Sequence, residues 1–407
     1  MRFVVGFLAV LAVALGGTLL LSPDDAGNQD DTALFTDEPS PLLEPTAVPE
    51  PTPTPAPTAP PTPVPPTSYT VAFSGEVLSH GPVSSRAAAN SPGPRWPYDY
   101  RPMFAEVKPI FDSVDFAVCH VETPISRDNT NLEGYPVFNA PRELAEGMAA
   151  SGYDACSTAS NHSFDRGADG VVATIDRLEE AGLGWAGMAR SQAEDDTPVL
   201  YEVGDLTIGH LSYTYGLNGF VLPADEPYLV DVTEVDAVLA EAAAARTAGA
   251  DIVVLSIQWG NEYQVDPSPE QQELARTFLG SPDIDLIIGA HVHVVQPIDK
   301  IGGEFVVYGL GNFLSNQSAE CCPEASQNGI IAMAEITETD AGAWKVTGLS
   351  YVPTRVDRSD YTIVPLPAAL ASGGLGPETA AVYEQVIADT REVVTRLGTK
   401  VKIYRGD

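Results

Sequence analysis

Short apolar runs, each followed by small or polar residues, recur along the chain from residue 69 onward. Runs of this length that are bounded by turn residues predict buried strands, here at residues 69–74, 115–119, 153–157, 182–189, 251–257, 285–289 and 305–310. Between several of them, apolar residues recur at helical spacing and predict helices at residues 141–151, 168–181, 236–248 and 269–279. Strands that alternate with helices in this way are typical of an α/β fold.

Further strands are expected toward the end of the chain, and a helix follows them. A hairpin around Gly204-Asp205 joins residues 200–203 to 207–213. Strands are predicted at residues 330–336 and 344–351, and a helix at residues 377–397.

The loop Asn161-His162 lies between a predicted strand and the helix that ends at Gly182. Open α/β sheets bind ligands beyond the carboxyl ends of their strands, where this loop is expected. An asparagine there can offer an amide oxygen to a metal, and a histidine can transfer a proton. The alternative is that Asn161 caps the turn and His162 packs beneath it.

Polar residues of the kinds that bind metals follow the predicted strand ends. Five of the six histidines lie there: His80, His120, His162, His291 and His293. Glu76, Glu122, Asn161 and Gln258 occupy equivalent places. Carboxylate, amide and imidazole groups together suit Mn, Fe or Zn, as one ion or as a pair. A purely structural polar edge is the alternative interpretation.

The amino-terminal residues predict export. Residues 3–21 are an unbroken apolar run, preceded by Arg2 and followed by Asp24-Asp25, which suits a single membrane span with the amino end inside. A cleaved signal peptide is the alternative, and would make the protein secreted. Residues 22–68 are rich in Pro, Thr and acidic residues, a composition typical of an extended spacer. The expected organisation is a signal anchor or signal peptide at 1–22, a linker at 23–68, a folded extracellular domain at 69–355 and a C-terminal helical extension at 356–407.

The charge of the chain narrows the range of partners. A formal net charge of −35 and a pI near 4.2 argue against nucleic acid and against an anionic membrane surface. Binding of an anionic polymer would depend on metal ions and on local arginines, namely Arg86, Arg95, Arg101, Arg127 and Arg166. Those arginines are equally able to pair with the abundant acids.

The four cysteines allow three pairings. Cys119 and Cys156 lie on strands that are expected to be neighbours, which is compatible with a disulfide and with two buried thiols. Cys321-Cys322 lie on a polar loop, where a vicinal disulfide or pairing with the other two cysteines is possible.

Six motifs together resemble a known family. They are Gly75-Glu76, His120-Val121-Glu122-Thr123-Pro124, Ser160-Asn161-His162, Gln258-Trp259-Gly260-Asn261-Glu262-Tyr263, His291-Val292-His293-Val294-Val295-Gln296-Pro297 and Gly311-Asn312-Phe313. Their order is similar to that in the CapA-type capsule synthesis family, named for poly-γ-glutamate synthesis, which resembles the calcineurin-like metallophosphoesterases. The resemblance implies a sandwich of two mixed β-sheets flanked by helices.

The resemblance also implies roles for individual residues. Glu122 would bridge two metal ions, and Glu76 with one of His291 or His293 would complete one site. Asn161, Gln258 and the other histidine would complete the second site, and His162 would donate a proton to the leaving group. His80, His120 and Asn312 are possible additional residues at this edge. Glu76, His120 and Gln258 stand where the family usually has aspartate, asparagine and histidine.

The function implied is an exported, membrane-anchored, metal-dependent hydrolase of phosphoesterase type that acts on a capsule or envelope polymer. Its partners would be an anionic envelope polymer or a phosphoester substrate, with other capsule-synthesis proteins. The alternative is a non-catalytic subunit that binds the polymer or supports its export.

Overall fold

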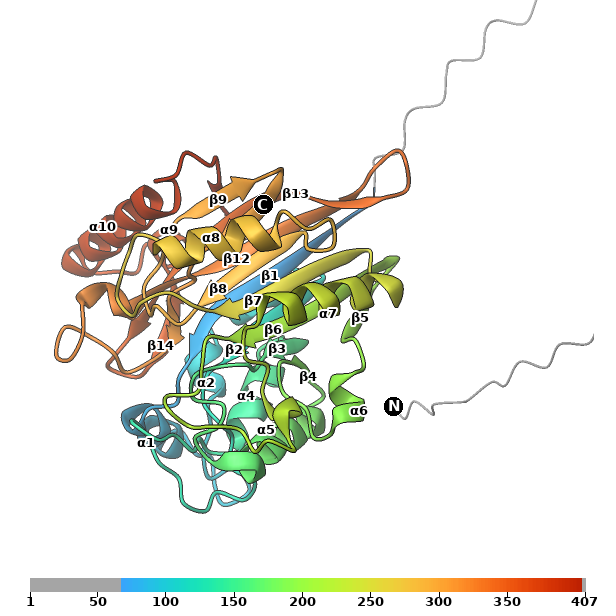
Figure 1. Ribbon diagram of the computed structural model, residues 1–407. Helices are drawn as coiled ribbons and strands as arrows, with labels where there is room; N and C mark the ends of the chain where they lie inside the picture. The colour runs from blue at the N-terminus through green and yellow to red at the C-terminus, as the bar shows by residue number, and fades with distance from the viewer. Residues whose placement is uncertain (1–66, 405–407) are drawn as a thin grey trace, which may run out of the picture. The chain divides into compact units, whose positions relative to one another are not determined.

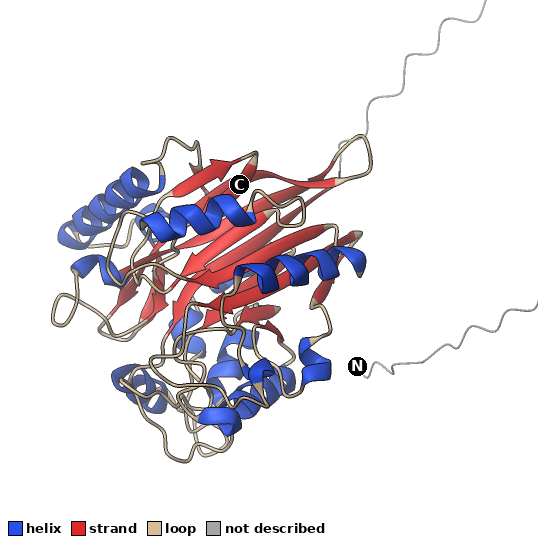
Figure 2. Ribbon diagram, in the orientation of Figure 1, coloured by secondary structure: helices blue, strands red, loops and turns tan. Residues whose placement is uncertain are grey.

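The computed structural model describes residues 67–404. The apolar run at residues 3–21 lies outside this part of the chain, and its predicted membrane span stays a prediction. No helix between residues 67 and 404 is both long enough and apolar enough to cross a membrane. The described strands form two mixed sheets with helices on their outer sides, as Figures 1 and 2 show. This arrangement confirms the predicted α/β sandwich.

The first sheet has nine strands and is centred on β1 (Ser68–Val77). On one side of β1, antiparallel pairing continues through β12 (Asn328–Glu338), β13 (Trp344–Asp357) and β14 (Thr362–Pro365). On the other side, parallel pairing continues through β2 (Phe116–Val121), β3 (Ala155–Ser157) and β4 (Gly184–Ala186). The short strands β11 (Asn312–Leu314) and β15 (Lys402–Ile403) pair with β1 and β13.

The second sheet has six strands, in the order β5, β6, β7, β8, β10, β9. Their bounds are Leu200–Val203, Leu206–Thr214, Ile252–Gln258, Leu286–Ala290, Glu304–Val307 and Ile298–Ile301, in that order. β7 lies between β6 and β8 and is parallel to both. Every residue of β7 and β8 is buried, which explains their continuous apolar sequences.

Apolar side chains from the inner faces of both sheets form a common core, which includes Val71 and Val118 from the first sheet and Ile208 and Val254 from the second. The outer face of the second sheet packs against α7 (Val235–Thr247) and α8 (Pro269–Phe278). The outer face of the first sheet packs against α1 (Gly81–Ala89), α2 (Arg101–Phe104), α3 (Lys108–Phe111), α4 (Glu143–Ala150) and α5 (Gly167–Ala181). The remaining helices are α6 (Gln192–Asp195), α9 (Leu366–Ala371) and α10 (Pro377–Val394), with short 3₁₀ turns at Pro227–Leu229 and Glu324–Gln327.

Local sequence signals explain where the helices begin and end. Ser268 caps α8 through a reciprocal hydrogen-bonded box with Gln271, and proline stands at the start of the helix as predicted. Gly182 ends α5 in the left-handed conformation, with φ of 81°.

The segment expected as a C-terminal helical extension contains α9 and α10, but also β14 and β15. Both strands pair with β13. This part of the chain therefore extends the first sheet as well as adding helices to it.

Three strand ends differ from the sequence prediction in a way that affects the site. β1 continues through Glu76, β2 includes His120, and Gln258 is the last residue of β7. Glu76, His120 and Gln258 are therefore part of strand ladders, so their backbones are held by pairing rather than by loops.

Candidate metal centre

Three buried side chains meet where β1, β2 and β8 end. Glu76 lies in β1, Glu122 directly follows β2, and His293 lies on the loop after β8. One potential ligand atom from each lies within 4.8 Å of the other two. His293 Nδ1 is 2.6 Å from Glu76 Oε2, and His293 Nε2 is 3.9 Å from Glu122 Oε1. Two carboxylates and an imidazole so placed can hold a divalent transition metal.

Of the three side chains, Glu122 has the least favourable environment for a negative charge. Its side chain is fully buried, and neither carboxylate oxygen has a hydrogen-bond partner among the described residues. Burial raises the pKa of Glu122 well above its ordinary value, while the charge of His293 acts in the opposite direction. A buried carboxylate without partners is costly unless a cation is bound beside it. The chemistry of this residue therefore fits a metal ligand.

Glu76 and His293 form a buried ion pair. Although burial opposes the effect, the charge of His293 and its hydrogen bond hold the pKa of Glu76 below its ordinary value. Burial likewise opposes charging of His293, but Glu76 and Glu122 raise the pKa of His293 to about 10. Binding a metal through His293 requires the neutral imidazole, so metal and proton compete for this residue. Asn312 Oδ1 also lies 3.1 Å from His293 Nδ1.

The backbone around the site is held in uncommon conformations. His291 and His293 have positive φ values of 89° and 58°. Residues other than glycine seldom adopt this region, and such strain is concentrated at functional sites. The His291 N–H donates to Glu76 Oε1 at 2.6 Å, which fixes the loop against β1. A Cβ atom on Gly75 would lie 1.8 Å from the carbonyl oxygen of Gly311, so only glycine allows β1 to approach so closely.

Gln258 joins two other predicted site residues. Its Oε1 accepts hydrogen bonds from the Asn161 backbone N–H at 2.7 Å and from the Thr214 hydroxyl at 3.3 Å. Its NH2 group therefore faces His120, with 3.0 Å between Gln258 Nε2 and His120 Nε2. The amide orientation is set by the two donors to its oxygen.

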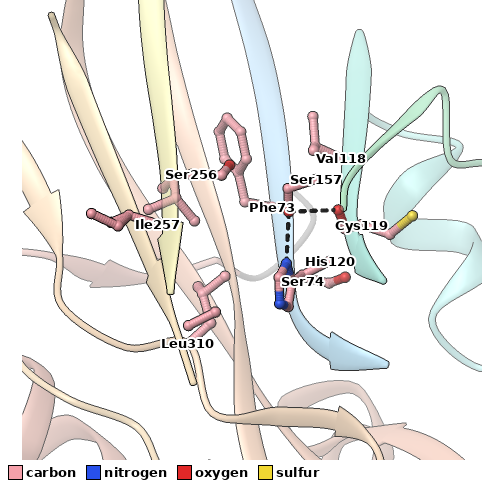
Figure 3. A pocket seen from close by; sticks show the side chains of 11 residues that line it. Phe73, Ser74, Val118, Cys119, His120, Ser157, Ser256, Ile257 and Leu310 are labelled. Atoms are coloured by element: carbon pink, nitrogen blue, oxygen red, sulfur yellow. Dashed lines mark hydrogen bonds between the residues drawn. The ribbon is translucent and has the colours of Figure 1, made fainter. Parts of the chain in front are cut away.

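His120 continues the hydrogen-bond chain from Gln258 to Ser157, whose side chain appears beside it in Figure 3. Because its Nε2 accepts from Gln258, its proton lies on Nδ1, which donates to Ser157 Oγ at 2.9 Å. Ser157 in turn donates to the Cys119 carbonyl at 3.3 Å. Burial lowers the pKa of His120 to about 4, in agreement with a neutral ring. The void beside this chain measures about 10 Å³, the space of a single water molecule.

His162 is oriented by Asp165, a residue that the sequence analysis did not single out. His162 Nδ1 donates to Asp165 Oδ2 at 2.8 Å, and the same oxygen accepts from the Phe138 N–H at 2.7 Å. The ring of Phe138 packs edge-on against His162, with 4.7 Å between centroids. The spacing of three residues between histidine and aspartate within a turn was the available signal for this pair.

The predicted site residues divide into three groups. Glu76, Glu122 and His293 form the ligand cluster, with Asn312 hydrogen-bonded to it. Asn161, Gln258 and His120 form a connected hydrogen-bond network. His80 and His162 line a neighbouring cavity, while His291 has a buried Nδ1 without a partner among the described residues. The assignment of Asn161, Gln258 and His291 as ligands of a second metal stays a prediction.

The cavity next to the cluster has a volume of about 420 Å³. His293 and His162 both line it, together with residues that the sequence analysis left unassigned: Leu78, Tyr135, Phe138, Tyr263, Asn316 and Gln317. Glu262, Cys321 and Cys322 complete the lining. A molecule held there would lie against both the ligand cluster and His162.

The register of the strands determines which cysteines form a disulfide. Cys119 on β2 and Cys156 on β3 are register partners and form a disulfide. Cys321 and Cys322 are free thiols, so the vicinal disulfide considered from the sequence is not formed. Cys322 Sγ instead accepts a hydrogen bond from the Tyr263 hydroxyl at 3.6 Å.

The motifs match a described family. Residues 70–317 match the model for the bacterial capsule synthesis protein PGA_cap. The chain belongs to the PGA_cap family. The matched range begins within β1 and extends past β11, and it contains the complete ligand cluster and the Asn161-His162 loop.

Two relatives carry names that describe a role in PGA biosynthesis or in capsule biosynthesis. The chain is 28% identical over 227 residues to the PGA biosynthesis protein CapA of Bacillus subtilis, covering 53% of this chain and 57% of the relative. It is 28% identical over 231 residues to the capsule biosynthesis protein CapA of Bacillus anthracis, covering 55% of each. The chain therefore spans little more than half the length of these curated relatives.

Solved structures with a similar arrangement include phosphoesterases and nucleotidases. The calcineurin-like phosphoesterase YfkN of Bacillus subtilis gives a TM-score of 0.42 at 14% identity, covering 81% of this chain and 99% of that one. A 5'-nucleotidase precursor of Thermus thermophilus gives a TM-score of 0.42 at 13% identity, covering 82% and 60%.

Proposed function

We propose that this PGA_cap protein is a metal-dependent hydrolase of phosphoesterase type that acts in the synthesis of poly-γ-glutamate capsule or another envelope polymer. The names of its relatives support the process, and the buried cluster supports the chemistry. The observation that carries the proposal is Glu122, a fully buried carboxylate beside Glu76 and His293, neither oxygen of which has a hydrogen-bond partner among the described residues.

The metal would be held first by Glu76, Glu122 and His293. Mn, Fe and Zn all accept two carboxylates and an imidazole. A bound ion of this kind polarises a phosphoryl oxygen and lowers the pKa of a water molecule. A second ion, with Asn161, Gln258 and His291 as ligands, is part of the proposal from the family resemblance.

His162 would supply the proton for the leaving group. Asp165 accepts from Nδ1, which holds the ring in place and leaves Nε2 as the nitrogen that would carry the transferred proton. Because His162 lines the cavity, a leaving group in the cavity lies within reach of this ring. Asp165 is a positioning residue, since it acts through His162.

The proposal includes the place of the protein in the cell. The apolar run at residues 3–21 and the proline-rich linker favour a single-pass anchor with the folded domain outside the membrane. Capsule-synthesis proteins at the membrane are the proposed partners. Protease treatment of intact cells should release the domain by cleavage in the linker; protection in intact cells but not in lysed cells would contradict this topology.

Hydrolysis of p-nitrophenyl phosphate by the Mn-loaded protein tests the activity. We expect His162→Ala to lower kcat by about 10²- to 10⁴-fold, the usual contribution of a general acid. Its metal content should remain unchanged, because His162 is outside the ligand cluster. Asp165→Asn should lower kcat less and shift the pH profile, as befits a positioning residue. Full activity in His162→Ala would refute the assignment.

One observation favours a non-catalytic alternative. The Gln258 oxygen already accepts two hydrogen bonds, from the Asn161 N–H and from the Thr214 hydroxyl, and is therefore not free to bind a metal. A polymer-binding or export-supporting subunit would bind metal and polymer without turnover. Bound metal together with no hydrolysis of any phosphoester would support this alternative.

A further inference from the structure

The size and the lining of the cavity beside the ligand cluster indicate which chemical group can be attached to the reacting bond. Its volume of about 420 Å³ lies in the range of small-molecule sites. Since His293 and His162 both line it, it is placed to hold the part of a substrate next to the bond that is cleaved.

The charges around this cavity are unusual for a site that would bind a polyanion. Among the described residues, those that line it include no lysine or arginine. Its one carboxylate, Glu262, makes no hydrogen bond or ion pair within the described part of the chain and is exposed. His80 is neutral: its Nδ1 accepts the Asn316 N–H at 3.3 Å, and burial lowers its pKa to about 4. Away from the metal ligands and His162, the lining of the cavity therefore offers an anion one carboxylate and no positive charge.

The arginines that might have compensated are engaged elsewhere. Arg101 pairs with Asp99, Arg127 with Asp176, and Arg166 with Glu133, at distances of 2.8 to 2.9 Å between charged atoms. None of these three arginines lines the cavity. A chain of free carboxylates, such as poly-γ-glutamate, would meet no lysine or arginine among the described residues that line the cavity.

The other lining groups suit a hydroxylated ring. Tyr135, which is 76% exposed, and Phe138 lie with 6.4 Å between ring centroids, and Tyr263 adds a third aromatic ring. Aromatic faces pack against the C–H faces of sugars. Within the described part of the chain, the side-chain hydrogen bonds of Asn316 and Gln317 use their amide oxygens, which leaves both NH2 groups to donate. Glu262 can accept from hydroxyl groups without needing a charged partner.

We propose that this cavity binds an uncharged, hydroxyl-bearing group of the carbohydrate class, and that the substrate is a phosphoester of such a group. This inference rests on the proposed phosphoesterase function and narrows its substrate. The phosphoryl group would lie toward the metal ligands, the bond to the sugar oxygen would break, and His162 would protonate that oxygen. Water would supply the hydroxyl group that remains on phosphate.

A pair of matched substrates tests the role of charge. Glycerol 3-phosphate and 3-phosphoglycerate differ by a hydroxymethyl group in place of a carboxylate. We expect the Mn-loaded protein to have a kcat/KM about three- to fivefold higher for glycerol 3-phosphate, the effect of one like charge a few ångströms away in a water-like medium. Glu262→Lys replaces repulsion by attraction and should change this ratio by about tenfold in favour of 3-phosphoglycerate.

Glu270→Lys is the matched control, because Glu270 is exposed on α8, is not among the cavity residues and gives the same change in net charge. An equal change in the ratio in both lysine variants would overturn the inference. A wild-type preference for 3-phosphoglycerate would do so too, while leaving phosphoester hydrolysis established.

The aromatic wall is tested separately with Tyr135→Ala. Since Tyr135 is largely exposed, its truncation should leave the fold intact. We expect kcat/KM for glucose 6-phosphate to fall about three- to tenfold, with a smaller change for glycerol 3-phosphate, which lacks a ring. Equal effects on the two substrates would overturn the carbohydrate assignment. No turnover of any of these substrates by the metal-loaded protein would instead overturn the proposed function, and this inference with it.

Discussion

Replacing Glu122 by glutamine should stabilise the metal-free protein and at the same time abolish its stabilisation by metal. The substitution keeps the size and shape of the side chain but removes the possibility of a negative charge. In the wild type, both oxygens of Glu122 are buried and have no hydrogen-bond partner within residues 67–404. The amide would place an NH2 group near the Glu76 carboxylate, within the same cluster.

The size of the effect follows from the burial of this carboxylate. Leaving a buried polar group unpaired costs about 1–3 kcal/mol, so the metal-free variant should gain roughly that amount. Because the pKa of Glu122 is raised in the folded state, its favourable contribution is complete at low pH and is lost as the pH rises. The difference between variant and wild type should therefore widen as the pH rises above the ordinary pKa of a glutamate.

In the presence of metal, the wild type should become more stable than Glu122→Gln. At a free concentration about 100 times its Kd, a metal that binds only the folded state adds about 2.7 kcal/mol to the wild type. For a domain of this size, 1 kcal/mol corresponds to about 2 °C in Tm. Thermal unfolding with a chelator and with Mn, combined with metal analysis, measures both effects. Glu270→Gln serves as the control for an exposed glutamate.

Two outcomes would refute this reasoning. A Glu122→Gln protein that is less stable than the wild type in the presence of chelator would show that the carboxylate is not a source of strain. A variant that is still stabilised by Mn to the same extent would show that Glu122 is not a metal ligand.

Three other changes test separate parts of the structure. Gln258→His should raise metal stoichiometry and phosphoester hydrolysis together, because imidazole is a better ligand than an amide for soft transition ions; identical calorimetric titrations of the two proteins would leave Gln258 a structural residue. Burial raises the pKa of Glu241 from 4.5 to about 7, so its contribution to stability is complete below pH 4.5 and declines up to about pH 7. Glu241→Gln should remove that decline, so that its free energy of chemical unfolding at pH 8 exceeds that of the wild type by at most about 3 kcal/mol. A variant whose stability depends on pH as that of the wild type does would contradict this. The double replacement of Cys119 and Cys156 by alanine opens a loop with a separation of 37 residues and should lower the free energy of unfolding by about 2–4 kcal/mol; equal unfolding midpoints would show that the disulfide adds nothing.

Much of the fold could be predicted from patterns within short segments. β7 is recognisable because all its residues are buried and its sequence is continuously apolar. α8 is recognisable because Ser268, Pro269 and Gln271 form a local capping arrangement. β14 and β15 were missed, since they are short and owe their existence to pairing with β13 rather than to a pattern of their own.

By itself, the sequence determined the longer strands and helices, the α/β class and the residue types gathered after the strand ends. These follow from periodicity and from the placement of polar residues beyond apolar runs, which are local properties. The presence of Glu76, Glu122, Asn161, His162 and His293 near one edge was therefore predictable.

Only the tertiary structure decided which of these side chains meet. Glu76 and His293 are 217 residues apart and pair because β1 and the loop after β8 come from different sheets that pack together. The same packing turns the Gln258 oxygen toward the Asn161 N–H. The pairing of Cys119 with Cys156, chosen from three connectivities, follows from the register of β2 on β3. Such contacts depend on strand register and on the packing of two sheets, which no segment of sequence contains alone.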